Sequence, residues 1–262
     1  MEETRPAGGN TNPPAKKEGT AMADILAFSA HPDDVEIGAG GTLARHCRLG
    51  YEVVACDLTL GEMATNGDPG SRAIESREAA RLLGLAAREA LGLRDRALEP
   101  TPERIRALVE VVRRHRPRVV LAPFGQDRHP DHAAAERLVR EAVFSAGLAR
   151  FAAAGQPHRV AHIVCYFVNS RPEPHFLVDV SEVYEVKRAA LAAYASQFGA
   201  PAAPAGATDR TGRDPTPTIL NGDFLEWVEL RDRWYGSLIG VARAEGFRWE
   251  GALTVDDLVR RL

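Results

Sequence analysis

The sequence has only three cysteines in 262 residues, and none of them is spaced like a zinc-finger or redox pair. Cys47, Cys56 and Cys165 each lie in an apolar stretch, so we expect free thiols rather than a disulfide framework or a thiolate metal site. The sequence also lacks an apolar run of the roughly 20 residues that a membrane-spanning helix needs. Its N-terminus lacks the apolar core of a signal peptide. These absences predict a cytoplasmic protein.

An excess of charge of one sign is also missing. The sequence has 33 basic and 36 acidic residues, a formal net charge of -3, and its lysines and arginines are dispersed. Without a basic field to hold a phosphate backbone, nucleic acid is not an expected partner. A hydrophobic content of 45% over this length is enough for the core of one full-sized domain.

Composition separates one core domain from three peripheral segments. Residues 1–22 are rich in Pro, Gly, Asn, Thr and Lys and contain almost nothing apolar, which predicts a disordered tail. Residues 200–217, rich in Ala, Pro and Gly, are expected to form a mobile loop. We expect the domain itself over residues 23–250, with residues 251–262 as a C-terminal segment.

Short apolar runs alternate with segments of helical period along most of the chain. The expected strands are 25–28, 52–59, 89–93, 119–122, 160–168 and 176–180. The expected helices are 43–49, 72–83, 101–117, 132–146, 181–199 and 223–245. Strands that alternate with helices in this way form right-handed βαβ units. The pattern therefore predicts an α/β, Rossmann-like three-layer fold, with a mostly parallel sheet and helices on both faces.

Two polar clusters each follow one of the expected strands directly. Residues 29–38, after the first strand, include one histidine and three carboxylates, and residues 129–132, after the fourth, include two histidines and an aspartate. Open α/β sheets keep their ligand sites at the carboxyl ends of the strands. We therefore expect the two clusters to form one shared site.

The residue types in these clusters suit a catalytic zinc ion. Zinc accepts histidine and carboxylate ligands, and a catalytic site uses three protein ligands and leaves one position for water. His31, Asp34 and His132 supply such a set. Asp33, which is free of the metal, is placed to act as the base for a water molecule that the metal activates.

The second cluster also contains a candidate acid. His129, three residues before His132, can act as a protonated donor to an oxyanion, with Asp131 orienting its imidazole as carboxylates often do. A metal, a base and an oxyanion donor are together the parts of metal-assisted amide or ester hydrolysis.

Three other interpretations of the clusters compete with this one. An aspartate after a strand is often only a helix cap, but two clusters of the same composition favour a metal site. A metal phosphoesterase normally needs more carboxylates, because they bridge two ions. A dinucleotide-binding fold is suggested by Gly38, Gly40 and the acidic Asp57, but Leu43 stands at the third glycine position and a polar run separates the strand from the first glycine.

The same motifs resemble those of a known family. Ala30-His31-Pro32-Asp33-Asp34 with Glu36, Gly38 and Gly41, followed by His129-Pro130-Asp131-His132, resembles the LmbE-like zinc-dependent N-deacetylases, which are related to the phosphatidylinositol-glycan class L deacetylase. The resemblance runs from about Ile25 to Gly246. Within the family, the bacillithiol-pathway enzyme that deacetylates N-acetylglucosaminyl malate is the most similar in three stretches: Cys56-Asp57-Leu58-Thr59, Asn66-Gly67 with Arg72, and Tyr194-Ala195-Ser196-Gln197-Phe198.

This resemblance implies one zinc ion per chain on His31, Asp34 and His132. It also implies the roles given above: Asp33 as the base, and His129 as the acid with Asp131 behind it. It also implies that Arg72 and Tyr194 reach the substrate, and a guanidinium can hold a malate carboxylate through two hydrogen bonds. Membership would further imply a homo-oligomer, either a trimer or a hexamer.

The function expected from the sequence is therefore zinc-dependent removal of the acetyl group from an N-acetylglucosaminide. The most specific expectation is N-acetyl-alpha-D-glucosaminyl L-malate, in bacillithiol biosynthesis. The alternatives are a deacetylase of another N-acetylated amino sugar and a conjugate amidase. The expected partner is a small-molecule substrate. Neither nucleic acid nor a membrane is an expected partner.

Overall fold

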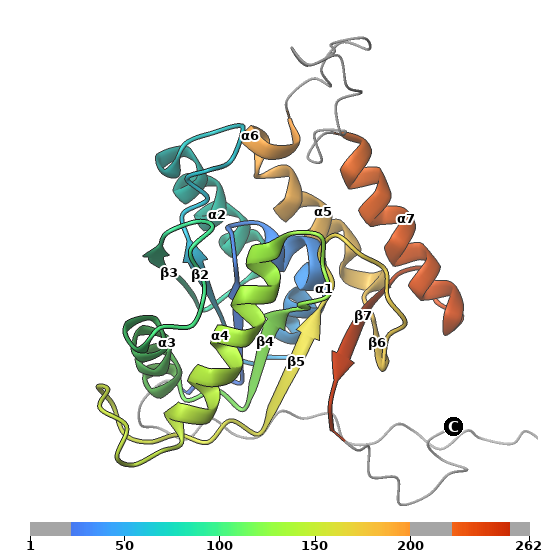
Figure 1. Ribbon diagram of the computed structural model, residues 1–262. Helices are drawn as coiled ribbons and strands as arrows, with labels where there is room; N and C mark the ends of the chain where they lie inside the picture. The colour runs from blue at the N-terminus through green and yellow to red at the C-terminus, as the bar shows by residue number, and fades with distance from the viewer. Residues whose placement is uncertain (1–21, 200–221, 252–262) are drawn as a thin grey trace, which may run out of the picture.

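A computed structural model describes residues 22–199 and 222–251 (Figure 1). The strands in these ranges are β1 (Ile25–Ser29), β2 (Val53–Thr59), β3 (Ala87–Leu93), β4 (Val119–Pro123), β5 (His162–Tyr166), β6 (Phe176–Asp179) and β7 (Ala244–Trp249). They form one sheet in the order β3-β2-β1-β4-β5-β7-β6. The first five strands run parallel, and β7 is antiparallel to both β5 and β6. The expected tail, mobile loop and C-terminal segment lie outside the described residues, apart from Met22 and Gly251.

The helices lie on both faces of the sheet. They are α1 (Asp34–Arg48), α2 (Pro69–Leu83), α3 (Pro102–His115), α4 (Pro130–Ala146), α5 (Tyr184–Ala192), α6 (Ala195–Phe198) and α7 (Gly222–Leu238), with a short 3-10 turn at Ser181–Val183. Helices α3 and α4 cover one face, and α1, α2, α5 and α7 lie on the other side (Figure 1). The predicted three-layer α/β fold with a mostly parallel sheet is confirmed.

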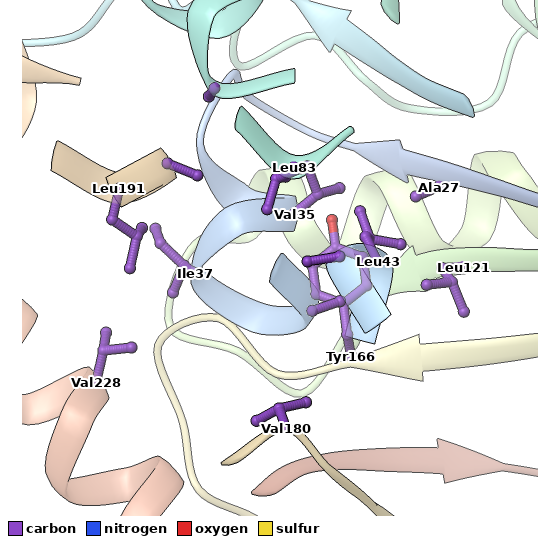
Figure 2. Packing of buried hydrophobic residues seen from close by; sticks show 14 of the residues in the cluster. Ala27, Val35, Ile37, Leu43, Leu83, Leu121, Tyr166, Val180, Leu191 and Val228 are labelled. Atoms are coloured by element: carbon purple, nitrogen blue, oxygen red, sulfur yellow. The ribbon is translucent and has the colours of Figure 1, made fainter. Parts of the chain in front are cut away.

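The core is divided into two layers by the central strands. Ile25 and Ala27 of β1 contact the apolar cluster under α1, α2 and α5, whereas Leu26 and Phe28 contact the cluster under α3 and α4. Every residue of β1 and β2 is buried, as expected for parallel strands that are covered on both faces. Figure 2 shows the first cluster, in which Val35 of α1 packs among side chains of the sheet and of the neighbouring helices.

Helix α1 begins earlier than the sequence predicts. It starts at Asp34, so the polar cluster at residues 29–38 is already helical from Asp34 onward, and the helix start expected at residue 43 is wrong. The glycines in this stretch allow close packing rather than a loop, because a Cβ on Gly41 would lie 2.7 Å from Cβ of Val180. Tertiary packing here overrides the low helix propensity of glycine.

The C-terminal part of the expected last helix is also wrong. Helix α7 ends at Leu238, the chain turns at Gly240 with φ 72°, and residues expected to be helical up to Glu245 enter β7. The sequence pattern does not predict β7, which inserts between β5 and β6. A six-residue strand that starts with Ala-Glu-Gly has a weak strand pattern, so its partners decide the structure.

Buried charges connect β7 and two helices. Nζ of Lys187 in α5 lies 2.6 Å from Asp232 of α7 and 2.7 Å from Glu245 of β7, and the three side chains are fully buried. The Glu245 carboxylate also accepts hydrogen bonds from the backbone N–H groups of Gly41 and Thr42 in α1, at 2.9 and 2.7 Å. One carboxylate therefore joins β7 to α5 and to the middle of α1.

Arg231 of α7 makes a second connection to α1. Its guanidinium donates to the backbone carbonyl of Ile37 at 2.7 Å, and to the carbonyls of Phe167 and Val168 after β5 at 2.9 and 3.1 Å. These bonds hold the first turns of α1 against the chain that follows β5.

Two absences expected from the sequence hold within the described ranges. Cys47, Cys56 and Cys165 are free thiols, and the latter two are buried. In this part of the chain no helix combines the length and the apolar character that crossing a bilayer requires.

Replacing Lys187 by Met should lower the free energy of unfolding by about 3–5 kcal/mol, because Asp232 and Glu245 would stay buried without their cation. Urea denaturation followed by circular dichroism measures this change. Arg188→Met is the matched control, since the neighbouring Arg188 forms an exposed ion pair with Glu185 and its loss should cost less than about 1 kcal/mol. Equal losses in the two variants would contradict the role given to the buried cluster.

Candidate metal centre and active site

The parallel pairing of β1 with β4 brings the two polar clusters together. Ala27 lies opposite Leu121 in the register, so both strands end at the same edge of the sheet. The rings of His31, His129 and His132 meet there, with centroids 4.7 to 5.8 Å apart, and one nitrogen from each ring lies within 4.8 Å of the others. Residues about a hundred positions apart therefore face one another.

Asp34 lies between two of these histidines. Its Oδ2 is 3.5 Å from Nδ1 of His31, and its Oδ1 is 3.2 Å from Nε2 of His132. In a tetrahedral zinc site with bonds of about 2.0–2.1 Å, neighbouring ligand atoms are about 3.3 Å apart. Each of the two imidazoles therefore places a nitrogen at about this spacing from the Asp34 carboxylate, and the zinc ligand set itself stays a prediction.

The electrostatic potential at this position is strongly negative. Although burial opposes it, Asp131 and Asp34 raise the pKa of His31 to about 10. Asp34 and Asp127 likewise raise the pKa of His132 to about 9 against the effect of burial. A potential that favours a proton on both imidazoles also favours a divalent cation, and the donor set consists of atoms that zinc accepts.

Asp127, which the sequence analysis missed, supports one of these histidines. Its Oδ1 lies 3.0 Å from Nδ1 of His132, and its carboxylate accepts hydrogen bonds from the backbone of His129 and from the backbone and side chain of Asn169. Burial opposes the effect, but His132 lowers the pKa of Asp127 to about 2. A carboxylate behind a metal-binding histidine fixes its ring and raises its basicity. Asp127 stands two residues before His129, in the loop after β4, and this position in the sequence could have identified it as part of the site.

Asp33 has an unusual backbone and a buried carboxylate. It precedes α1 with φ 118°, a left-handed conformation that non-glycine residues adopt at a cost of about 1–3 kcal/mol. Burial raises the pKa of Asp33 to about 7, although Arg72 opposes this. A general base works best when its pKa lies near the working pH.

The structure places Arg72 on Asp33. Nη2 of Arg72 lies 3.0 Å from Oδ2 of Asp33 and also donates to the backbone carbonyl of Pro32, and the side chain is 3% exposed. Gly61, with φ 68°, covers the guanidinium, and a Cβ there would lie 2.9 Å from its Cζ. One guanidinium nitrogen of Arg72 therefore holds Asp33 while the side chain also lines the cavity, and its expected contact with the substrate stays a prediction.

His129 acts as the N-cap of α4. Its Nδ1 accepts the backbone N–H of Asp131 at 3.2 Å, which leaves Nε2 as the ring position that can carry a proton. Burial and the neighbouring His31 and His132 lower the pKa of His129, which favours the neutral form of the ring, and its role as a protonated donor stays a prediction. A neutral ring with its proton on Nε2 can still donate a hydrogen bond.

The expected pairing of the Asp131 carboxylate with His129 is not present. Oδ2 of Asp131 lies instead 3.3 Å from Nε2 of His31 and accepts the backbone N–H of Arg96 at 3.0 Å. The reason is the helix start, which uses Nδ1 of His129 as an acceptor and so leaves no N–H on that nitrogen for a carboxylate.

Tyr194 lies in the core rather than in the site. Its side chain is fully buried in the apolar cluster under α1, α2 and α5, and it does not line the cavity described below. This position does not support the expected substrate contact, which stays a prediction. The sequence places Tyr194 on an apolar helix face, and a core position is the usual meaning of such a pattern.

A family model described as "PIG-L: GlcNAc-PI de-N-acetylase" matches residues 26–143. The chain is 35% identical over 189 residues to a diacetylchitobiose deacetylase of Thermococcus kodakarensis, and the match covers 66% of this chain and 70% of the relative. It is 32% identical over 246 residues to a 1D-myo-inositol 2-acetamido-2-deoxy-alpha-D-glucopyranoside deacetylase of Nocardia farcinica. This match covers 68% of this chain and 82% of the relative. The chain belongs to the PIG-L family.

A further relative of this PIG-L protein is a probable N-acetyl-alpha-D-glucosaminyl L-malate deacetylase 2 of Bacillus cereus, 29% identical over 230 residues, with 80% of this chain and 96% of the relative covered. Among solved structures, the conserved protein TT1542 from Thermus thermophilus is 39% identical with a TM-score of 0.79, and 90% of this chain and 98% of that chain are covered. The chain is thus an N-deacetylase of the N-acetylglucosaminide type.

The site of this PIG-L protein lies in a cavity of about 500 Å³. One wall is the loop after β2, which contributes Met63. The cavity is also lined by Asp95, Arg96 and Arg128, none of which the sequence analysis identified. Asp95 follows β3, so it reaches the site from the same edge of the sheet. Its position directly after a strand is the sequence feature that could have identified Asp95 as a site residue.

Replacing Asp127 by Asn should weaken zinc binding by about 10–100-fold, because His132 would lose the carboxylate that orients its ring. Competition with a chelator of known affinity measures the zinc dissociation constant. Asp24→Asn is the matched control, since Asp24 precedes β1 at the opposite end of the strand from His31. Unchanged affinity in the Asp127 variant would show that His132 does not bind the metal.

Proposed function

We propose that this PIG-L protein is a zinc-dependent deacetylase of N-acetyl-alpha-D-glucosaminyl L-malate, in bacillithiol biosynthesis. The supporting observation is that three arginines, Arg72, Arg96 and Arg128, line the same cavity as the candidate metal ligands and the candidate base. A cavity with a hydrolytic centre and cationic groups suits an N-acetylated sugar that carries carboxylates.

His31, Asp34 and His132 are proposed to hold the zinc ion. When bound, the ion supplies Lewis acidity at the acetamide carbonyl and lowers the pKa of the attacking water. Asp34 lies between the two imidazoles and is kept ionised, because His132 and His31 lower its pKa well below the usual range in spite of burial. The contacts of Asp34 with both imidazoles therefore preorganise the proposed ligand set.

Asp33 is proposed as the base that takes the proton of the attacking water and returns it to the sugar nitrogen as acetate leaves. Arg72 positions this carboxylate by holding its Oδ2 at 3.0 Å. His129 is proposed to donate from Nε2 to the oxygen of the former carbonyl, where negative charge develops. The cap bond to α4 orients the ring for this role.

Asp95 is proposed to bind the sugar. Its Oδ2 accepts the backbone N–H of Met63 at 2.9 Å, whereas its Oδ1 has no hydrogen-bond partner among the described residues, although the residue is only 4% exposed. A sugar hydroxyl would satisfy this buried oxygen, which is costly to leave unpaired.

Together with Arg72, which lines the same cavity, Arg96 and Arg128 are proposed to bind the malate carboxylates. Both side chains are exposed. Arg128 donates to Oδ1 of Asn169 at 3.2 Å, and Nη1 of Arg96 lies 3.9 Å from Asp131, so neither guanidinium is held as firmly as that of Arg72. Arginine binds carboxylates through paired hydrogen bonds, which favours an acidic aglycone.

The alternatives are an N-acetylglucosaminide with a neutral aglycone, such as an inositol or a second sugar, and a conjugate amidase. The names of the Nocardia and Thermococcus relatives support the neutral aglycones. A substrate panel with malate, inositol and chitobiose conjugates separates these candidates. A cytoplasmic location and a homo-oligomer, trimer or hexamer, stay predictions.

Replacing Asp33 by Asn should reduce the rate of acetate release from the malate conjugate by about 10²–10⁴-fold, because a neutral amide cannot take the proton. Acetate is measured by a coupled assay and bound zinc by elemental analysis, and zinc content should not change. A wild-type rate in a variant that retains zinc would remove Asp33 from the mechanism. If the zinc-loaded wild type releases acetate from no conjugate in the panel, the proposed function is wrong.

Replacing Arg128 by Met should raise the KM for the malate conjugate by about 10–100-fold, because a charged hydrogen bond to the carboxylate is lost. The KM for the chitobiose conjugate should change little, since that substrate has no carboxylate. Arg118→Met is the control, because Arg118 is also exposed but lies before β4, at the opposite edge of the sheet. Equal effects on both substrates would exclude Arg128 as the determinant of an acidic aglycone.

A further inference from the structure

Two carboxylates face His31 on the ring edge that points away from Asp34. Nδ1 of His31 faces Asp34, whereas Nε2 lies 3.3 Å from Oδ2 of Asp131 and 3.8 Å from Oδ1 of Asp95. One ligand atom from each of His31, Asp95 and Asp131 lies within 4.8 Å of the others. This group shares one imidazole with the candidate zinc site but uses its other nitrogen and two different carboxylates.

One carboxylate is sufficient to orient the imidazole, so the second needs another explanation. Asp131, at 3.3 Å, can accept the N–H of His31 in the way that carboxylates orient metal-binding histidines. Asp95 is not needed for that role. Its Oδ1 has no hydrogen-bond partner in the described part of the chain and yet is buried beside a second carboxylate. Burying such a charge is costly unless a cation or a donor reaches it.

We propose that Asp95, Asp131 and Nε2 of His31 form a second, weaker zinc site in the same cavity. An imidazole nitrogen and two carboxylate oxygens are ligands that zinc accepts, and distances of 3.3 and 3.8 Å are close to the separation of about 3.3 Å between zinc ligands. The cation replaces the proton that Nε2 shares with Asp131, and that proton leaves to solvent.

The position of this second site predicts its effect on the enzyme. Asp95 lines the cavity, and its free oxygen is the one proposed above to bind a sugar hydroxyl. A zinc ion on that oxygen and the sugar exclude each other. Excess zinc therefore inhibits by competing with the substrate. This last step alone rests on the proposed function, because the binding of the ion does not depend on the reaction.

Equilibrium dialysis of the metal-free chain against buffered free zinc, with elemental analysis of bound metal, tests the site without any substrate. The wild type should bind one ion tightly and a second with a dissociation constant at least about tenfold higher, because both ions share His31. Asp95→Asn should bind only the tight ion, and its amide oxygen can still accept the backbone N–H of Met63. Asp131→Asn should also lose the weak ion, but it should in addition bind the tight ion about 10–100-fold less strongly, because Asp131 orients His31.

Asp34→Asn is the matched control, because it should lower the affinity for the first, tight ion and leave the binding of the second, weaker ion unchanged. The proposal is overturned if the wild type binds only one ion, or if both the Asp95 and the Asp131 variants still bind two.

With active wild type, excess zinc should raise the KM for the substrate and leave kcat unchanged. A fall in kcat without a change in KM would place the inhibitory ion elsewhere. Absence of deacetylation with two bound ions would overturn the proposed function and not the second site.

Discussion

The parallel pairing of β1 with β4 is the constraint on which the site depends. The two strands are not consecutive, and the chain between them forms β2 and β3 on the other side of β1. At the boundary between β1 and β4, the connections leave the sheet in opposite directions, and the loops at the carboxyl ends of the strands separate to leave a crevice. Residues 31–34 after β1 and residues 129–132 after β4 form the two sides of that crevice. The fold itself therefore determines where a ligand can bind.

The second general feature of the site is its excess of negative charge. Asp33, Asp34, Asp95, Asp127 and Asp131 surround three imidazoles, and Arg72 is the buried arginine among the residues that line the cavity. Such an arrangement is unfavourable for a protein without a bound cation, because each carboxylate loses hydration that only some of its neighbours replace. A metal bound here would therefore contribute to the stability of the fold as well as to the chemistry.

Much of the fold and of the site was predictable, because both depend on local patterns. The apolar runs before His31 and His129 identify central strands, and the strand-helix alternation identifies their parallel pairing. Helix α1 could not be placed correctly, since its glycines have low helix propensity and are retained for close contacts with Val180 and other distant residues. β7 was missed for a similar reason, because its pairing with β5 and β6 involves residues far apart in the chain.

Residue types were predicted more reliably than their partners. The sequence indicated that Arg72 and Asp131 belong to the site, but it did not indicate that Arg72 holds Asp33 or that Asp131 faces His31. Those pairings depend on side-chain directions at helix starts, such as the use of Nδ1 of His129 as a cap. Asp95 and Asp127 are single aspartates in loops, and only the folded chain shows that they reach the histidines.

The carboxylate of Glu245 has a consequence for the order in which the protein is made. Every candidate catalytic and metal-binding residue lies within the first 132 positions, and a ribosome synthesises them early. The backbone of α1, which carries Asp34, is nevertheless hydrogen-bonded to Glu245 and Arg231, which lie between 194 and 204 positions further along the chain than their partners. A nascent chain that already contains all of its reactive groups therefore still lacks these hydrogen bonds until Glu245 has been synthesised.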